Sequence, residues 1–391
     1  MNQETPKVPA KRAKKTNVLF RIVALAVTAA LVLGALVLVV HRDRYNLDAL
    51  KRWLSYRSLT TSETGEGEPF PYSGGSSQSL EYIGDGVLFA SNAGAHYYSL
   101  SGDLYKEEIV NLSNPVLSAS EHAGVVYDAG GQSLLFFQNG AKTFSLDLEG
   151  GGDLLSARVN DAGWLAVTAQ ESGYKGSVTV YNSDYEKVIN ISLSSTFLVD
   201  AAVSPDCKTV AVVTMGQSGG SFQSQLLLYP TNAQEPSATL SLGSMTVLDL
   251  EYEQNQIWLL SDSALVVADA KGQSSAVYSF GRDYLKGCAL DGDGFALLLL
   301  GRYRAGTASQ MVVIGPDGAL TATRNLTGQV LSFDAAGRYL ALLTGDNLTI
   351  YTPDLNPYAT LESAQNARYT ALTPNGTAIL ADQQKVWLFR P

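Results

Sequence analysis

The feature that most constrains the fold is a repeat with a period of about 41 residues that begins near Leu80. Each unit contains an apolar stretch, a turn rich in Gly, Asp or Asn, a strongly apolar strand, a second apolar strand, and a last strand after another turn. Seven intervals separate Gly86 from Gly376 over 290 residues, so the spacing is regular along most of the chain. Such a period, with four strands in each unit, is typical of a β-propeller.

Eight aligned turns mark the units, and strands rich in Val, Leu and Ile follow them, as expected of sheets covered on both faces by neighbouring blades. The turns are Gly84–Gly86, His122–Gly124, Asp161–Gly163, Ser204–Asp206, Gln254–Gln256, Asp291–Gly294, Asp334–Gly337 and Thr373–Gly376. A β-sandwich or a pair of all-β domains does not explain eight similar units at one spacing. The sequence therefore predicts an all-β chain with a β-propeller over residues 68–391, of eight blades or alternatively seven.

The last unit is incomplete, because it ends at Pro391 after its third strand. A final blade without an outer strand would expose an unpaired edge. The segment Glu68–Tyr72 is available to supply that strand, and its two prolines are tolerated on an edge strand. We therefore expect residues near 68–74 to close the ring.

An uncharged run from Ile22 to Val40 precedes the repeat. About 19 helical residues span the roughly 30 Å hydrocarbon core of a bilayer, so the run predicts a transmembrane helix within residues 18–41. The run is longer than the apolar region of a signal peptide, and no small-residue cleavage motif or lipid-accepting cysteine follows it. We therefore expect a single uncleaved membrane anchor.

The charge distribution predicts the orientation of that anchor. Residues 1–57 hold 11 Lys/Arg and 3 Asp/Glu, a net charge of +8, and the whole chain is −10, so residues 58–391 carry −18. The basic tail, residues 1–17, should stay in the cytoplasm and the propeller should lie outside it, at the cell membrane. So acidic a domain should repel nucleic acid, which excludes that class of partner.

Residues 42–59 predict a short amphipathic helix. Leu47, Leu50 and Leu54 recur on one face, with basic residues between them and with Trp53 and Tyr56 suited to a membrane interface. The alternative is a helical stalk that does not touch lipid. Residues 60–67, which include Thr-Ser-Glu-Thr-Gly, are typical of a flexible linker.

The segments Arg42–Leu47, Arg52–Arg57 and Glu68–Tyr72, together with the apolar run, resemble a family of clostridial single-pass membrane proteins catalogued only as a domain of unknown function. The large part of that family resembles WD40-like and quinoprotein-like propellers. The resemblance implies a Gram-positive cell surface and an ectodomain that is a propeller. It implies no catalytic residues.

The motifs of propeller enzymes are absent from the sequence. Trp53, Trp164, Trp258 and Trp387 do not form the Gly-to-Trp pattern of quinoprotein blades, and no Ser-x-Asp-x-Gly-x-Thr-Trp turn occurs. After the anchor the chain has only His96 and His122, which lie in different units and without a second His or Cys at metal-ligand spacing. The segment Asp291–Gly294 lacks the later ligands of a calcium loop. We therefore expect no catalytic residues, no bound metal and no cofactor.

One group of residues could form a binding site. Counting six residues back from the aligned turns gives Leu80, Ser118, Ala157, Asp200, Asp249, Cys288, Leu331 and Thr370 as positions around the centre of the ring. Asp200 and Asp249 come from neighbouring units, so their carboxylates could bind a cation or share a proton, or could both face water. If they repel each other in an empty ring, replacing both with Asn should stabilise the domain.

Two classes of function follow from the sequence. The first is a non-catalytic, membrane-anchored scaffold that binds a protein or another component of the cell envelope. The alternative is a small-ligand or cation sensor, or an enzyme, that uses the centre of the propeller. The absence of catalytic motifs favours the scaffold, and a flat aromatic patch on one face of the propeller would favour a protein partner.

Overall fold

The computed structural model describes residues 23, 25–29, 32, 47–56, 62, 64–75, 78–84, 86–148, 152–273, 275–364 and 366–391. The described part of the predicted anchor is helical, and the rest of it lies outside the described residues, as does the basic tail. No helix among the described residues is both long and apolar enough to cross a membrane. The helix α2 (Leu47–Tyr56) lies within the predicted helical segment 42–59, and its Leu47, Leu50 and Leu54 side chains are exposed.

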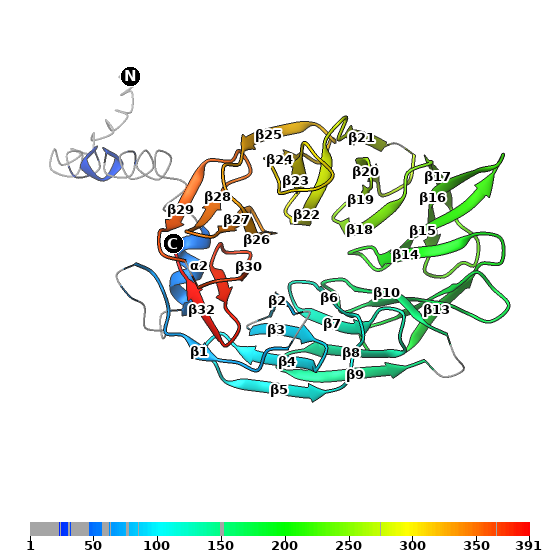
Figure 1. Ribbon diagram of the computed structural model, residues 1–391, viewed down its shortest axis with the longest axis horizontal. Helices are drawn as coiled ribbons and strands as arrows, with labels where there is room; N and C mark the ends of the chain where they lie inside the picture. Colours follow the sequence, from blue (N-terminus) through cyan, green and yellow to red (C-terminus); the bar gives the residue numbers. More distant parts are fainter. Residues whose placement is uncertain are drawn as a thin grey trace, which may run out of the picture. The chain divides into compact units, whose positions relative to one another are not determined.

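Antiparallel sheets of four strands form the blades over the described residues (Figure 1). Blade 1 contains β2 (Ser79–Ile83), β3 (Gly86–Ser91), β4 (Gly94–Ser99) and β5 (Leu104–Ile109). Blade 2 contains β6 (Pro115–Ala119), β7 (Ala123–Asp128), β8 (Ser133–Gln138) and β9 (Ala141–Asp147). Blade 3 contains β10 (Leu154–Val159), β11 (Leu165–Ala169), β12 (Ser177–Tyr181) and β13 (Lys187–Ser192). Blade 4 contains β14 (Phe197–Val203), β15 (Thr209–Ser218), β16 (Ser221–Pro230) and β17 (Ala238–Gly243).

The second half of the ring repeats this arrangement. Blade 5 contains β18 (Val247–Glu253), β19 (Gln256–Ser261), β20 (Ala264–Asp269) and β21 (Ser275–Ser279). Blade 6 contains β22 (Tyr284–Gly292), β23 (Phe295–Gly301), β24 (Gln310–Ile314) and β25 (Leu320–Asn325). Blade 7 contains β26 (Val330–Ala336), β27 (Tyr339–Thr344), β28 (Leu348–Tyr351) and β29 (Pro357–Leu361). Blade 8 contains β30 (Tyr369–Leu372), β31 (Ala378–Ala381), β32 (Lys385–Phe389) and, from the other end of the chain, β1 (Phe70–Pro71).

A separate hydrophobic core fills each interface between neighbouring blades. Between blades 1 and 2, for example, Ile83 and Leu88 pack with Val126 and Phe137. Cores of this kind occur between every two successive blades formed by the described residues, including blades 8 and 1. The ring is therefore closed with eight blades, which confirms the predicted fold and excludes the seven-bladed alternative.

The strands differ in burial according to their place in the blade. The second and third strands are buried along most of their length, as in β23, whose sequence is Phe-Ala-Leu-Leu-Leu-Leu-Gly. Outer strands such as β9 alternate between exposed and half-buried residues. This difference arises because a blade in the ring is covered on both faces near its middle, so its strands there can be continuously apolar.

The outer strand of blade 8 comes from the predicted segment. Phe70 pairs with Val386, and the Gly67 N–H donates to the Leu388 carbonyl oxygen at 2.8 Å. The Tyr72 hydroxyl donates to the carbonyl oxygen of Asp382 at 2.6 Å, and both Phe70 and Tyr72 are buried. The prediction that residues near 68–74 close the ring is therefore confirmed.

Each blade has two ends, which we name by the direction of its inner strand. The upper end is where the inner strand begins, and it carries the connections between blades and the loop between the second and third strands. The lower end is where the inner strand finishes. The inner strands β2, β6, β10, β14, β18, β22, β26 and β30 lie around the centre of the ring (Figure 1).

Candidate functional sites

Arg158 connects the two carboxylates that the sequence singles out. Its Nε donates to Oδ2 of Asp200 at 2.8 Å, and its Nη2 lies 2.7 Å from the same oxygen. Nη2 also donates to Oδ1 of Asp249, and Nη1 lies 3.8 Å from Oε2 of Glu251. One guanidinium on β10 of blade 3 thus neutralises charge on blades 4 and 5. The structure brings Asp200 and Asp249 to the same basic group.

Bulges in the inner strands set the register of these side chains. The pairing of the first and second strands shifts just before Ser156, Asp200, Asp249, Gly287 and Ser332, so these residues occupy matching positions. The sequence-based positions Ala157, Cys288 and Leu331 are therefore wrong by one residue. A fixed count back from the turn fails because the turns that follow the inner strands differ in length and geometry.

Gly287 explains why the series of aspartates stops at blade 6. A Cβ atom at this position would lie 2.4 Å from the ring of Phe333 in blade 7, which is closer than atoms can approach. A carboxylate at this position would require the Phe333 ring to move. Asp291, near the lower end of the same strand, supplies the negative charge of blade 6 instead.

Further carboxylates approach the centre of the ring from other blades. Burial and the neighbouring charge of Asp291 raise the pKa of Glu251 to about 8 and the pKa of Asp334 to about 8. Burial and the charge of Asp249 raise the pKa of Asp291 to about 6. Burial and the charge of Asp334 raise the pKa of Glu81 well above its usual range. These side chains reach solvent but are surrounded by protein, so several of them hold protons near neutral pH.

Cys288 is not an activated nucleophile. Burial, together with the charge of Asp249, raises the pKa of its thiol, and its Sγ lies 3.9 Å from Oδ2 of Asp249. A thiol surrounded by carboxylates stays protonated and unreactive. Cys207 and Cys288 are both free cysteines, so these two residues form no disulfide with each other.

The carboxylates at the centre do not form a preorganised metal site. Among the described residues, no group of three or more His, Cys, Asp or Glu side chains is placed to hold a metal ion. Asp200 and Asp249 each use one carboxylate oxygen on the guanidinium and accept the backbone N–H of the following residue through Oδ1. Arg158 is the positive charge that these two side chains require. Their role in binding a cation or another ligand stays a prediction.

The two histidines downstream of the apolar run occupy ordinary structural positions. His96 is buried in blade 1, and its Nε2 lies 3.0 Å from Oε1 of Glu107 on the neighbouring strand. His122 is exposed in the turn before β7.

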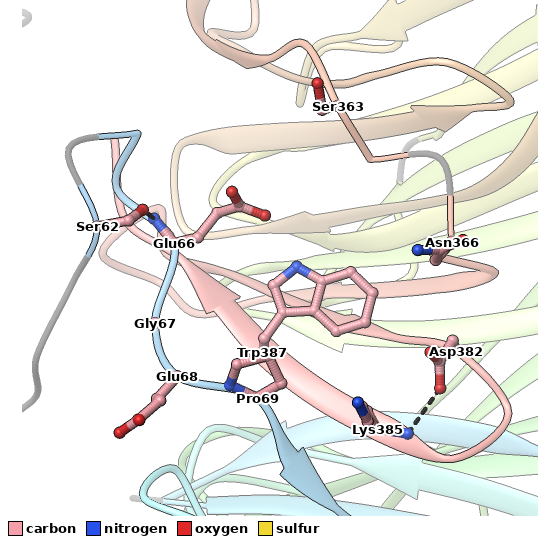
Figure 2. Close-up of a pocket in the computed structure, with 10 residues that line it drawn as sticks. All are labelled: Ser62, Glu66, Gly67, Glu68, Pro69, Ser363, Asn366, Asp382, Lys385 and Trp387. Carbon is pink, nitrogen blue, oxygen red and sulfur yellow. Dashed lines mark hydrogen bonds between the residues drawn. The ribbon is translucent and has the colours of Figure 1, made fainter.

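A pocket of about 570 Å³ lies beside the closing strand of blade 8. Figure 2 shows the indole of Trp387 in the middle of its lining, with Glu66, Asp382 and Lys385 around it. The remaining lining residues are Ser62, Gly67, Glu68, Pro69, Ser363 and Asn366. Its volume is in the range of small-molecule sites. The segment that closes the ring therefore also forms one wall of a pocket, which sequence patterns did not indicate.

Exposed apolar side chains lie at the upper end of four consecutive blades. We call this set the aromatic patch: Tyr174, Phe197, Phe222, Leu248, Tyr284 and Tyr303. Their exposed fractions range from 45% to 77%. Tyr174 belongs to blade 3, Phe197 and Phe222 to blade 4, Leu248 to blade 5, and Tyr284 and Tyr303 to blade 6.

The hairpin of β15 and β16 raises part of the aromatic patch above its surroundings. These two strands have ten residues each, whereas pairing with the outer strand β17 stops at Ser224. Phe222 lies beyond that point, opposite Gln217, next to a turn of two glycines with positive φ. Across the neighbouring interface, Nζ of Lys175 lies 4.5 Å from the centre of the Phe197 ring.

Known structures share this fold. The C-terminal WD40 domain of Sif2 matches with a TM-score of 0.56 at 12% identity, covering 82% of this chain and 99% of that domain. The computationally designed Ika8 protein matches with a TM-score of 0.58 at 11% identity, covering 82% of this chain and 99% of its own. At such low identities these matches show the WD40-like propeller fold alone.

Sequence comparison gives the family. A search of curated proteins found no match. A profile described as "Family of unknown function (DUF5711)" matches residues 55–367, which begin at the end of α2 and reach into the connection between blades 7 and 8. Because this match covers most of the chain, the protein belongs to the DUF5711 family of unknown function.

Proposed function

We propose that this protein is a non-catalytic scaffold that is anchored in the cell membrane by one N-terminal helix and holds its propeller outside the cytoplasm to bind a protein partner. The observation that supports this function best is the aromatic patch. Large exposed apolar patches are uncommon on proteins that act alone and often mark interaction surfaces. Tyrosine and phenylalanine are also enriched where proteins bind one another.

The support for anchoring comes from the sequence of the N-terminal region. The run from Ile22 to Val40 is uncharged and long enough to span a bilayer, and basic residues precede it. The exposed leucines of α2 give the next segment an apolar face. Together they favour a single-pass protein with a cytoplasmic N-terminus.

A scaffold is favoured over a ligand site at the centre of the ring because Arg158 already pairs with the carboxylates there. An incoming cation would have to compete with a guanidinium that has two short contacts to Asp200 and a further one to Asp249. A bound ligand at the centre would therefore cost the loss of existing ion pairs. A partner that binds the aromatic patch at the upper end of blades 3 to 6 would not have to displace Arg158 from its carboxylates.

Photocrosslinking in the native cell tests the proposal. A photoreactive phenylalanine analogue is placed at Phe222 or Tyr303 in the aromatic patch, and in separate variants at Leu104 or Leu320. Leu104 and Leu320 are each 50% exposed but lie at the lower end, so they are matched controls. We expect the patch positions to yield one discrete crosslinked product that the control positions do not.

The identity of the product decides the outcome. The same partner protein should be captured from both Phe222 and Tyr303, and replacing the other patch residues with serine should reduce its yield. Equal products from all positions, or none from the patch, would rule out the aromatic patch as the binding surface.

A further inference from the structure

The loop between β23 and β24 presents cations next to the aromatic patch. Arg302, Tyr303 and Arg304 are all exposed in this loop. Nζ of Lys286 donates to the carbonyl oxygen of Arg304 at 2.9 Å, and the Ser309 N–H donates to the carbonyl oxygen of Leu300 at 2.8 Å. The loop is therefore fixed at both sides and holds its side chains above blade 6.

The charge around the aromatic patch is opposite to that of the chain as a whole. At the upper end of blades 3 to 6 the cationic residues are Lys175, Arg282, Lys286, Arg302 and Arg304, and the carboxylates are Asp153, Glu171, Asp262 and Asp283, so the cations exceed the carboxylates by one. Glu171, Asp262 and Asp283 accept hydrogen bonds within the propeller, from Ser192, Thr246 and Gln310 respectively. This sector is thus basic, although residues 58–391 carry a net charge of −18.

The lower end of the blades has the opposite character. Its exposed carboxylates are Asp103, Glu121, Asp161, Asp184, Glu186, Asp206, Glu235, Asp291, Asp293, Asp317 and Asp354. Its cations are Lys187, Lys208, Lys271, Arg338 and Arg390. The upper end of blades 3 to 6, where the aromatic patch lies, therefore differs in charge from the lower end of the propeller.

The N-terminal part of the chain joins the propeller at the lower, acidic end. Nη1 of Arg390 donates to the carbonyl oxygen of Tyr56 at 2.6 Å, and Glu66 pairs with Phe389 at the lower end of β32. From there the chain runs towards the upper end, where the Tyr72 N–H donates to the carbonyl oxygen of Gln384.

We propose that the aromatic patch and the arginines of blade 6 recognise an acidic polypeptide segment that also carries apolar side chains. This inference rests on the proposed scaffold function and specifies its partner. Guanidinium groups bind carboxylates through paired, charge-assisted hydrogen bonds, and exposed aromatic rings bind apolar side chains. A polyanion without apolar groups would leave the rings exposed to water.

Selection of peptides displayed on phage, with the full chain in detergent as the bait, tests the inference. We expect enriched peptides to be rich in Asp and Glu and to contain Phe, Leu, Trp or Tyr. The variant R302E/R304E should bind synthetic copies of these peptides at least tenfold more weakly, and so should F222S/Y303S. The variant K187E/K271E makes the same change in net charge at the lower end and should leave binding unchanged. Raising the salt concentration should weaken binding, since charge contributes to it.

Each other outcome counts against a defined part of the proposal. Peptides that need Phe222 and Tyr303 but neither carry excess acid nor respond to R302E/R304E would overturn the acidic partner and leave the scaffold function intact. If the selected peptides bind both double variants as tightly as the parent protein, or if no peptide is enriched, both the acidic partner and the scaffold function of the aromatic patch would be overturned. If polyglutamate binds as tightly as the selected peptides, the ligand is a polyanion that needs no apolar side chains. If anionic vesicles bind but peptides do not, and F222S/Y303S abolishes the vesicle binding, the ligand is a lipid surface. Either result would overturn the proposed partner.

Discussion

Arg158 holds together carboxylates that would otherwise repel one another. Asp200 is only 6% exposed, and the guanidinium of Arg158 lies 2.7 Å from its Oδ2. The sequence predicted that the charges of Asp200 and Asp249 must be relieved, and the structure shows a basic residue in that role. The expectation that replacing both with Asn stabilises the domain is therefore reversed, because the change would leave Arg158 partly buried and without its counter-ions.

The first prediction concerns this ion pair. Replacing Arg158 with Met should lower the free energy of unfolding by about 3 kcal/mol, the lower part of the range for breaking a buried pair, since the side chain keeps some contact with solvent. D200N/D249N should also destabilise the domain. Urea denaturation of the full chain measures both, with Lys187→Met as the control for an exposed cation.

A double-mutant cycle checks the physical reason. Combining Arg158→Met with D200N/D249N should cost less than the sum of the two separate changes, because each removes the partner of the other. Additive effects would mean that Arg158 does not depend on these two aspartates.

The second prediction concerns pH. The pKa values of Glu251 and Asp334 are raised to about 8, and that of Asp291 to about 6, all above the values of these groups in an unfolded chain. The folded protein therefore binds more protons than the unfolded chain between about pH 4 and pH 8, so stability should fall as the pH rises through this range. The melting temperature should be higher at pH 5.5 than at pH 8.5.

Asp291→Asn should flatten this dependence, because Asp291 is a charge that raises the pKa of Glu251, Asp334 and Glu81. Melting curves at both pH values measure the effect, and Asp184→Asn at an exposed turn is the control. If Asp291→Asn changes the dependence no more than the control, the carboxylates do not interact at the centre of the ring.

At this scale the sequence predicted the two aspartates but missed Arg158, Glu251, Asp291 and Asp334. The alignment of turns gave positions Asp200 and Asp249 correctly. It gave Ala157 for blade 3, one residue from the matching position Ser156, because the turn that follows this inner strand differs from those of blades 4 and 5. The sequence places Asp291 in a turn. Its interaction with Glu251 and Asp334 depends on how the ring brings neighbouring blades together, which the sequence does not show. The available signal was weak, because Arg158 and Lys286 both lie in inner strands and the sequence does not show which of them meets Asp200 and Asp249.

Among the elements of the fold, the two-residue strand β1 and the adjacent Tyr72 connect blade 8 to blade 1. The ring of Tyr72 stacks on Phe89 with centres 4.5 Å apart, and Phe70 lies 6.0 Å from Tyr98. Both contacts join the closing segment to blade 1 as well as to blade 8. The turn and strand repeat predicted this closure because a missing strand in one unit must be supplied from elsewhere in the chain.

The third prediction tests the closure. The variant F70A/Y72A should lower the free energy of unfolding by at least about 3 kcal/mol, the usual cost of truncating a buried aromatic ring. The fluorescence of Trp387, which is 9% exposed on the neighbouring strand β32, should shift to longer wavelength if β1 separates. Ile109→Ala, at a residue that is 83% exposed, is the control. Unchanged melting and fluorescence would mean that β1 contributes little to the closed ring.

Other features of the elements could not be predicted from the sequence. The repeat predicts where strands begin and end, but the extension of β15 and β16 beyond their outer partner depends on pairing with β17. The exposure of side chains at the upper end also depends on which loops are neighbours in the folded ring. The residues of the aromatic patch are dispersed over 130 positions from Tyr174 to Tyr303, so only the folded ring shows them as one set.

For the whole molecule, the fourth prediction concerns topology. If the N-terminal helix spans the membrane with its basic tail inside, protease added to intact protoplasts should remove the propeller and leave a short membrane-bound fragment. A cytoplasmic protein measured in the same sample should stay intact. Protection of both proteins until the membrane is dissolved would place the propeller in the cytoplasm.

The closing strand also determines when the ring can be completed. The Tyr72 hydroxyl donates a hydrogen bond to the carbonyl oxygen of Asp382, 310 positions later in the chain, and β32 ends at Phe389. Synthesis proceeds from the N-terminus, so the segment that pairs with β32 is made first and must wait for nearly the entire propeller. Contacts this distant in sequence form late in folding, because the entropy of closing the intervening loop must be overcome. Until then the edge of β1 is unpaired. A chain that stops before Lys385 keeps seven blades and the two inner strands β30 and β31 of the eighth, but it leaves the edges of β31 and β1 unpaired and prone to pairing with its own copies.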